Sequence, residues 1–104
     1  MPTVAQLQRA LAADPSDPFL HYAFAQELSK AGAASLDPAI EAYDRCLALD
    51  PSYCYAYFHK AKVLEQLGRL DDAKATLTVG VAKAKQAADG KALSELAVYL
   101  DSLS

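Results

Sequence analysis

The sequence predicts an all-α fold of about six helices, arranged as repeated antiparallel helix hairpins. The first observation is composition, since the 104 residues include 22 Ala and 15 Leu but only five Val and one Ile. Ala and Leu lose least on entering a helix, whereas strands favour β-branched residues. The second observation is an internal repeat. Residues 7–16 and residues 43–52 share six of ten identities at an offset of 36.

A second pattern recurs at the same offset. Three sets of four residues have internal spacings of 3, 1 and 3, which places each set on one face of a helix. The sets are His21, Phe24, Ala25 and Leu28; Tyr57, Lys60, Ala61 and Leu64; and Leu93, Leu96, Ala97 and Leu100. The motif Leu-Asp-x-Ala recurs at 36–39 and 70–73, an offset of only 34, so the first hairpin loop is two residues longer than the second.

Local signals place the helices in order. They are expected at residues 3–13, 17–31, 37–49, 53–67, 70–87 and 91–103. Thr3 followed by Gln6 resembles a capping box, which is expected to begin the first helix. An aspartate before a proline, at Asp17 and at Asp37, is expected to cap the second and third helices. Ser52 is the expected cap of the fourth helix.

The fifth helix and the helix ends have their own signals. Asp71 and Asp72 lie in the first turn of the fifth helix, where negative charge suits the helix dipole. Gly32, Gly68 and Gly90 are expected to end helices or form hairpin turns, because glycine adopts the left-handed backbone conformation at little cost.

The order of these residues resembles the tetratricopeptide repeat, an antiparallel helix pair of about 34 residues. In the first unit the matching residues are His21, Phe24, Ala25, Leu28, Gly32, Ala39, Tyr43, Cys46 and Pro51. In the second unit they are Tyr57, Ala61, Leu64, Gly68, Ala73, Leu77 and Gly80. The resemblance implies one domain over residues 1–104, with repeats at 17–49 and 53–87 between the flanking helices 3–13 and 91–103.

Small residues recur at two positions where stacked helices are expected to approach closely. They are Ala25, Ala61 and Ala97 at one position, and Ala10, Cys46 and Gly80 at the other. Gly80 is expected to be a close-contact glycine, because glycine otherwise costs roughly 1 kcal/mol in a helix interior. The last helix is expected to pack back as a cap through one apolar face. That face consists of Leu93, Leu96, Leu100 and Leu103.

The resemblance also implies a function. Members of this family bind partners in a concave groove lined by the first helix of each pair, so the chain is expected to be a scaffold or adaptor that binds a peptide or protein segment. The expected groove residues are Phe19, Tyr22, Gln26, Tyr55, Phe58, His59 and Lys62. The last helix would add Lys91, Ser94, Glu95 and Val98. The alternative is that the aromatic residues pack together as ordinary core.

One family binding mode is not expected here. Some repeats of the family grip a C-terminal carboxylate with Lys and Asn side chains on successive first helices. The corresponding positions of this chain hold Tyr22, Gln26, His59, Lys91 and Glu95. Only Lys91 has the required chemistry, so recognition of a chaperone tail by that arrangement is disfavoured.

Two other classes of function stay open. Terminal helices that lack a neighbour can pair between chains, which makes a self-assembling homo-oligomer the first alternative. Its candidate residues are Val4, Ala5, Val98 and Tyr99. The second alternative is a metalloprotein or enzyme, but Cys46, Cys54 and His59 lack the spacing of a metal site. No nucleophile or phosphate-binding motif is present, so neither a metal, a cofactor nor catalysis is expected.

The cysteines, the histidines and the net charge disfavour several functions and do not indicate a specific one. Cys46 is expected to be a buried thiol and His21 a packing residue, whereas His59 is expected to be exposed. A net charge of -3 disfavours binding to nucleic acid or an anionic membrane. The chain has no apolar run of about 20 residues and no signal-peptide pattern at its start. A cytoplasmic protein is therefore expected.

Overall fold

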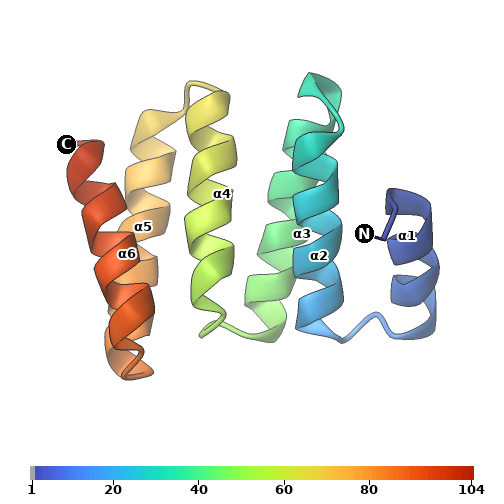
Figure 1. The fold of residues 1–104 in the computed structure, drawn as a ribbon, viewed down its shortest axis with the longest axis horizontal. Helices are drawn as coiled ribbons and strands as arrows, with labels where there is room; N and C mark the ends of the chain where they lie inside the picture. Colours follow the sequence, from blue (N-terminus) through green and yellow to red (C-terminus); the bar gives the residue numbers. More distant parts are fainter. Residues whose placement is uncertain (1) are drawn as a thin grey trace. The chain divides into compact units, whose positions relative to one another are not determined.

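The computed structural model describes residues 2–104, and those residues form helices and turns without any strand (Figure 1). The helices are α1 (Val4–Ala13), α2 (Pro18–Lys30), the short 3₁₀ helix η1 (Ala33–Ser35), α3 (Leu36–Leu49), α4 (Cys54–Gln66), α5 (Leu70–Gln86) and α6 (Gly90–Ser102). The predicted all-α fold with six α-helices is confirmed.

The helices form two compact units, which are described separately. Unit 1 (Met1–Asp50) contains the hairpin of α2 and α3, joined through η1, with α1 packed against α2. Unit 2 (Pro51–Ser104) contains the hairpin of α4 and α5. In unit 2, α6 packs against α5 and also contacts α4. The interpretation of the chain as one domain stays a prediction.

The first two helix starts are confirmed in detail. The Thr3 hydroxyl accepts a hydrogen bond from the Gln6 backbone N–H at 3.1 Å, and the Gln6 side chain accepts one from the Thr3 N–H at 2.8 Å. The Asp17 carboxylate accepts a hydrogen bond from the Phe19 N–H at 2.9 Å, with Pro18 as the first residue of α2. Side chains thus satisfy backbone donors that have no partner inside the helix.

Two of the expected caps are wrong. α3 already begins at Leu36, so Asp37 lies in its first turn instead of capping it. The reason is the longer first loop: Gly32 has a φ of 124°, and the residues after it wind into η1, which runs directly into α3. Ser52 lies in a turn, and Tyr53 precedes α4 as its N-cap without a side-chain capping bond.

The glycine predictions are confirmed at two of three positions. Gly32 and Gly68 have positive φ angles, as expected for turns that end helices. Gly90 instead is the first residue of α6, and the residue with positive φ after α5 is Ala88, at 55°. Asp89 caps α6 by accepting a hydrogen bond from the Ala92 N–H at 3.1 Å, so α6 starts earlier than expected.

The repeated apolar faces form the core. In unit 1, α2 and α3 bury Ala25, Ala39, Tyr43 and Cys46. In unit 2, the buried core residues include Ala61, Leu64, Ala73, Leu77 and Leu96. Ala97 is only half-buried, unlike Ala25 and Ala61, because no described helix follows α6. Both hairpins therefore use the same small-residue packing, and α6 docks as a cap through its apolar face.

A hydrogen bond to the turn before the first helix recurs in both units. The Tyr57 hydroxyl donates to the Pro51 carbonyl at 2.7 Å. His21, 36 positions earlier, is only 8% exposed, and its Nε2 lies 2.7 Å from the Pro15 carbonyl. A carbonyl can only accept, so Nε2 must carry the proton. The buried packing role expected for His21 is confirmed.

Gly80 is a point of close approach between the helices of unit 2. A Cβ atom at this position would lie 2.8 Å from Tyr57 Cβ on α4 and 3.4 Å from a Leu96 methyl group on α6. Real Cβ atoms do not approach that closely, so only glycine allows α5 to pack here. The predicted role of Gly80 is confirmed.

Gly80→Ala is expected to destabilise the protein by about 1–3 kcal/mol, although alanine is the better helix former, because the added methyl group overpacks the contact with Tyr57. Gly90→Ala is the matched control, since nothing lies within 4 Å of a Cβ at that position. It should change stability by less than about 0.5 kcal/mol. Urea denaturation measures both, and a Gly80→Ala protein as stable as Gly90→Ala would contradict the packing argument.

Candidate functional site

The expected groove residues of unit 1 lie along α2. Phe19, in the first turn, is 57% exposed. The half-buried Tyr22 meets the buried Tyr43 edge to face, with ring centroids 6.1 Å apart. Its hydroxyl accepts a hydrogen bond from Gln26 Nε2 at 3.0 Å. Tyr22 and Gln26 are therefore held in place by neighbours in their own unit, while Phe19 offers open apolar surface.

The expected groove residues of unit 2 gather around Phe58 on α4. The Tyr99 ring of α6 lies 5.2 Å from the Phe58 ring between centroids, and the His59 ring lies 5.4 Å away at a steep angle. Lys62 Nζ lies 5.0 Å from the Phe58 ring centroid, which is the geometry of a cation–π contact. Phe58 thus contacts an aromatic, an imidazole and an ammonium group.

Two tyrosine–glutamate interactions join α4 to α6. The Tyr99 hydroxyl donates to Glu65 Oε1 at 2.6 Å. In the opposite sense, Tyr55 of α4 pairs with Glu95 of α6. Burial, followed by these interactions with carboxylates, raises the pKa of both tyrosines. Both hydroxyls therefore stay protonated at neutral pH, and that of Tyr99 donates across the two helices.

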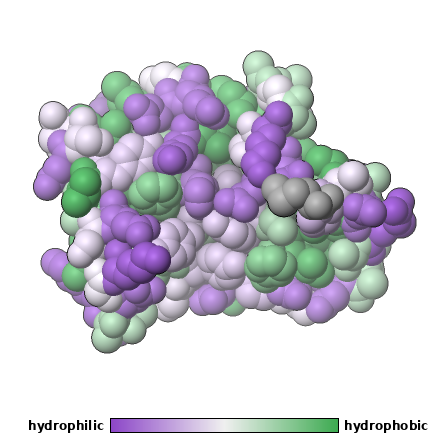
Figure 2. All heavy atoms as spheres, viewed as in Figure 1, coloured by the Kyte–Doolittle hydropathy of each residue, from purple (hydrophilic) through white to green (hydrophobic). Residues whose placement is uncertain are grey.

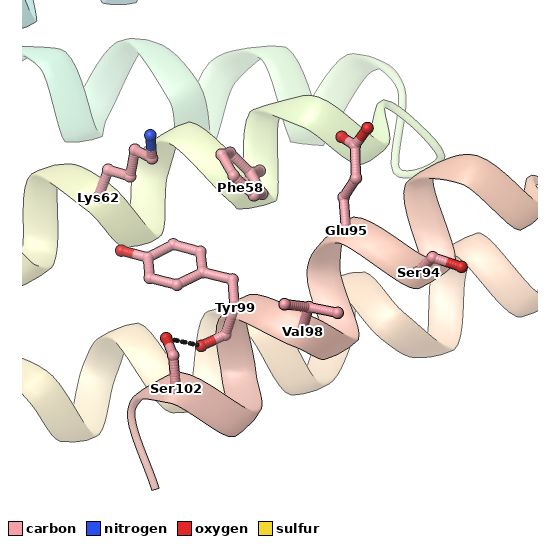
Figure 3. Close-up of a pocket in the computed structure, with 7 residues that line it drawn as sticks. All are labelled: Phe58, Lys62, Ser94, Glu95, Val98, Tyr99 and Ser102. Atoms are coloured by element: carbon pink, nitrogen blue, oxygen red, sulfur yellow. Dashed lines mark hydrogen bonds between the residues drawn. The ribbon is translucent and has the colours of Figure 1, made fainter.

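An open groove lies between α4 and α6, with a volume of about 440 Å³ (Figure 3). It is lined by Phe58, Lys62, Ser94, Glu95, Val98, Tyr99 and Ser102. Val98 is 69% exposed, which is more than any other large hydrophobic residue within residues 2–104. In Figure 3, Lys62 and Glu95 lie on opposite sides of Phe58. The groove therefore combines an apolar centre with one charge of each sign.

The surface outside this groove is mixed. On the face drawn in Figure 2, hydrophobic residues form separate patches between hydrophilic side chains. Such scattered exposure is ordinary for a folded protein, whereas an apolar depression lined by aromatic rings is typical of a binding site. The α4–α6 groove, defined by its seven lining residues, is thus the best candidate site in unit 2.

Some of the expected site residues of unit 2 line the groove, and others do not. Phe58 and Lys62 line the α4–α6 groove, and Tyr55 is tied to the groove residue Glu95. His59 does not line it, and the expectation that His59 is exposed is wrong, because contact with the Phe58 ring leaves it half-buried. A binding role for these residues, and for Phe19, Tyr22 and Gln26 of unit 1, stays a prediction.

Tyr99, which the sequence offered only for self-association, and Ser102 are groove residues that were not predicted. The repeat offset of 36 pairs Tyr99 with Val63, a buried core residue, and so gives no sign of a groove position. The helical spacing within α6 could have predicted both groove positions. Tyr99 lies four residues after Glu95, and Ser102 lies four residues after Val98, so both extend the same face by one turn.

The thiols have the character expected of packing residues. Cys46 and Cys54 are both buried, and neither forms a disulfide within residues 2–104. Burial, reinforced by the negative charge of Asp50, raises the pKa of Cys46 to about 12. Its reactive thiolate form is therefore scarce at neutral pH. Within residues 2–104, no three His, Cys, Asp or Glu side chains cluster in a way that could hold a metal ion.

Comparison with known proteins identifies relatives of the fold. A family model described as tetratricopeptide repeat matches residues 30–96. A tetratricopeptide repeat domain protein from Salinibacter ruber, solved by NMR, is 35% identical with a TM-score of 0.80, over 88% of this chain and 90% of that one. No protein of curated function matches the sequence.

Two more distant structures share the fold alone. PcrH in complex with the chaperone binding region of PopD is 20% identical, with a TM-score of 0.83, over 96% of this chain and 74% of that one. The Yersinia enterocolitica type III secretion chaperone SycD, in complex with a peptide of the translocator YopD, is 21% identical, with a TM-score of 0.79. That match covers 96% of this chain and 72% of SycD. None of the helices within residues 2–104 has the length and apolar character needed to cross a membrane.

His59 gives a pH-dependent prediction. Burial, and secondarily the positive charge of Lys62, lowers the pKa of His59 below its ordinary value of 6.5. The unfolded chain then binds more protons than the folded one between these two pKa values, so the free energy of unfolding decreases as the pH falls through the window below 6.5. His59→Gln should remove this part of the pH dependence, as measured by urea denaturation from pH 7.5 to pH 5.

Lys62→Met serves as the control, because it removes only the secondary cause while keeping the aliphatic stem. It should reduce the slope partly. Identical pH slopes for wild type and His59→Gln would contradict the assignment.

Proposed function

Because the chain belongs to the tetratricopeptide repeat family, we propose that it is a non-enzymatic protein-interaction module that binds a segment of another protein in the α4–α6 groove. The observation that carries this proposal is the exposure of Val98, at 69%, beside the paired rings of Phe58 and Tyr99. Covering an exposed apolar side chain releases ordered water and favours association. Aromatic rings that already touch lose little conformational freedom when a partner binds them.

The size and rigidity of the groove support a peptide segment as the ligand. A volume of about 440 Å³ suits one large side chain and its neighbours. The Tyr99–Glu65 hydrogen bond and the Tyr55–Glu95 interaction hold α4 and α6 together before any ligand arrives. PcrH and SycD, which share this fold, have each been solved with a segment of a translocator protein. They provide a precedent for a peptide ligand but do not identify the partner of this chain.

The α2 residues extend the same proposal to unit 1. Phe19 is more than half exposed and could supply a further apolar contact to a partner. Tyr22 and Gln26 bond to each other, so a partner would meet them as one fixed polar surface. We also propose a reducing compartment such as the cytoplasm, where proteins with cysteines outside disulfides, as Cys46 and Cys54 are within residues 2–104, are common.

Self-association through the α4–α6 groove is the second candidate. The exposed Val98 favours it as well, because a second copy would bury the same apolar surface. SycD, of the same fold, has been described with an alternative dimer. Sedimentation at high protein concentration distinguishes the two candidates, since a monomer throughout excludes self-association as the main role.

Val98→Asp should reduce capture of the binding partner from native lysate by about tenfold or more, because it places a charge in the apolar centre of the groove. Val79→Asp is the matched control. Val79 is 47% exposed on α5 and lies outside the groove, so this variant should capture as much partner as wild type.

Thermal denaturation should show both variants folded, since surface substitutions of this kind usually change stability by less than about 0.5 kcal/mol. Equal capture by Val98→Asp and wild type would overturn the proposal.

A further inference from the structure

The α4–α6 groove carries its two charges in a fixed order. Phe58 lies at the centre, with Lys62 on one side of it and Glu95 on the other (Figure 3). Glu95 lines the groove, whereas Glu65, the other carboxylate that interacts with a tyrosine, does not. A ligand lying along the groove therefore meets a positive charge, an apolar centre and a negative charge in succession.

Lys62 is available to a ligand. Its ammonium group lies over the Phe58 ring, and within residues 2–104 it forms no ion pair. The side chain is exposed and lines the groove. The cation–π contact positions the ammonium group at the edge of the apolar centre while leaving its N–H groups free to donate. An acidic side chain at this end of the groove would find a donor already in position.

Glu95 interacts with α4 and can still accept hydrogen bonds from a ligand. Its carboxylate interacts with Tyr55 of α4. An ionised carboxylate offers about four acceptor sites, so this interaction leaves room for a cationic donor from a ligand. A basic side chain at this end of the groove would therefore meet an oriented acceptor, and an acidic one would be repelled.

We propose that the α4–α6 groove selects peptide segments in which a large apolar side chain is flanked by an acidic residue toward Lys62 and a basic residue toward Glu95. This inference rests on the proposed function and names the chemistry of its ligand. Phe58, Val98 and Tyr99 supply most of the affinity, because ion pairs between exposed groups change binding by only about two- to fivefold each. The charges instead determine the order in which residues can lie along the groove.

An internal segment fits this arrangement better than a free C-terminus. A terminal carboxylate needs several donors around its two oxygens, and Lys62 is the single cationic residue that lines the groove. Glu95 would repel that carboxylate at the other end. A segment carrying both charges satisfies each end without leaving either groove charge unpaired.

The test is selection from a phage library of random 12-residue peptides against four forms of the full chain: wild type, Lys62→Met, Glu95→Gln and Val98→Asp. Lys62→Met keeps the packing on Phe58 while removing the charge, and Glu95→Gln keeps an acceptor for Tyr55 while removing the charge. Both variants are therefore expected to fold like wild type, which circular dichroism and thermal denaturation check.

Wild type should enrich peptides that have an acidic and a basic residue on opposite sides of a large apolar residue. Lys62→Met should lose only the acidic preference, and Glu95→Gln only the basic one. Synthetic peptides with amidated ends should bind each of these variants about two- to fivefold more weakly than wild type. They should not bind Val98→Asp measurably.

Other results overturn the inference. Selected peptides that fail to bind Val98→Asp can still lack any charge order, or bind Lys62→Met and Glu95→Gln as tightly as wild type. Either result contradicts the charge order and leaves the proposed function intact. A library that yields no peptide sensitive to Val98→Asp contradicts both. Selected peptides that lose binding on amidation indicate a terminal carboxylate. A wild-type dimer that Val98→Asp converts to monomer indicates a second copy as the occupant.

Discussion

The close packing at Gly80 is the constraint on which the rest of unit 2 depends. At this one position of α5, the absence of a side chain lets Tyr57 of α4 and Leu96 of α6 both reach the helix backbone. Interiors pack at nearly crystalline density, so a single methyl group here would push one of the two helices away. Because α4 and α6 are both anchored at the same point of α5, their spacing from each other follows from that contact.

The groove is a consequence of this anchoring. Phe58 follows Tyr57 in α4, and Glu95 precedes Leu96 in α6, so each groove residue lies about 100° around its helix from a buried anchor. The Tyr99–Glu65 hydrogen bond and the Tyr55–Glu95 interaction then join the helices on the solvent side. A site built on packed helices keeps its shape better than one built on loops, and this prepares the α4–α6 groove for a ligand.

The repeat, the six helices, the first two caps and the role of Gly80 could all be predicted from the sequence, because each depends on spacing along one chain. That Asp37 does not cap α3 could not be predicted, because Asp17 and Asp37 each precede a proline and only the winding of the loop after Gly32 distinguishes them. Tyr99 was missed for a different reason. Its bond to Glu65 joins residues 34 apart, and the repeat offset matches it to a core valine.

The α4–α6 groove separates affinity from selectivity in physical terms. Apolar contact with Val98 and the two rings has no direction, so it would accept many side chains in either orientation. Lys62 and Glu95 are individually weak because water screens them, yet they have opposite signs at opposite ends. A ligand placed in the wrong orientation replaces two attractions with two repulsions, and the difference between the orientations is larger than either pair contributes alone. Specificity for orientation can therefore arise in a shallow site where no single charge binds strongly.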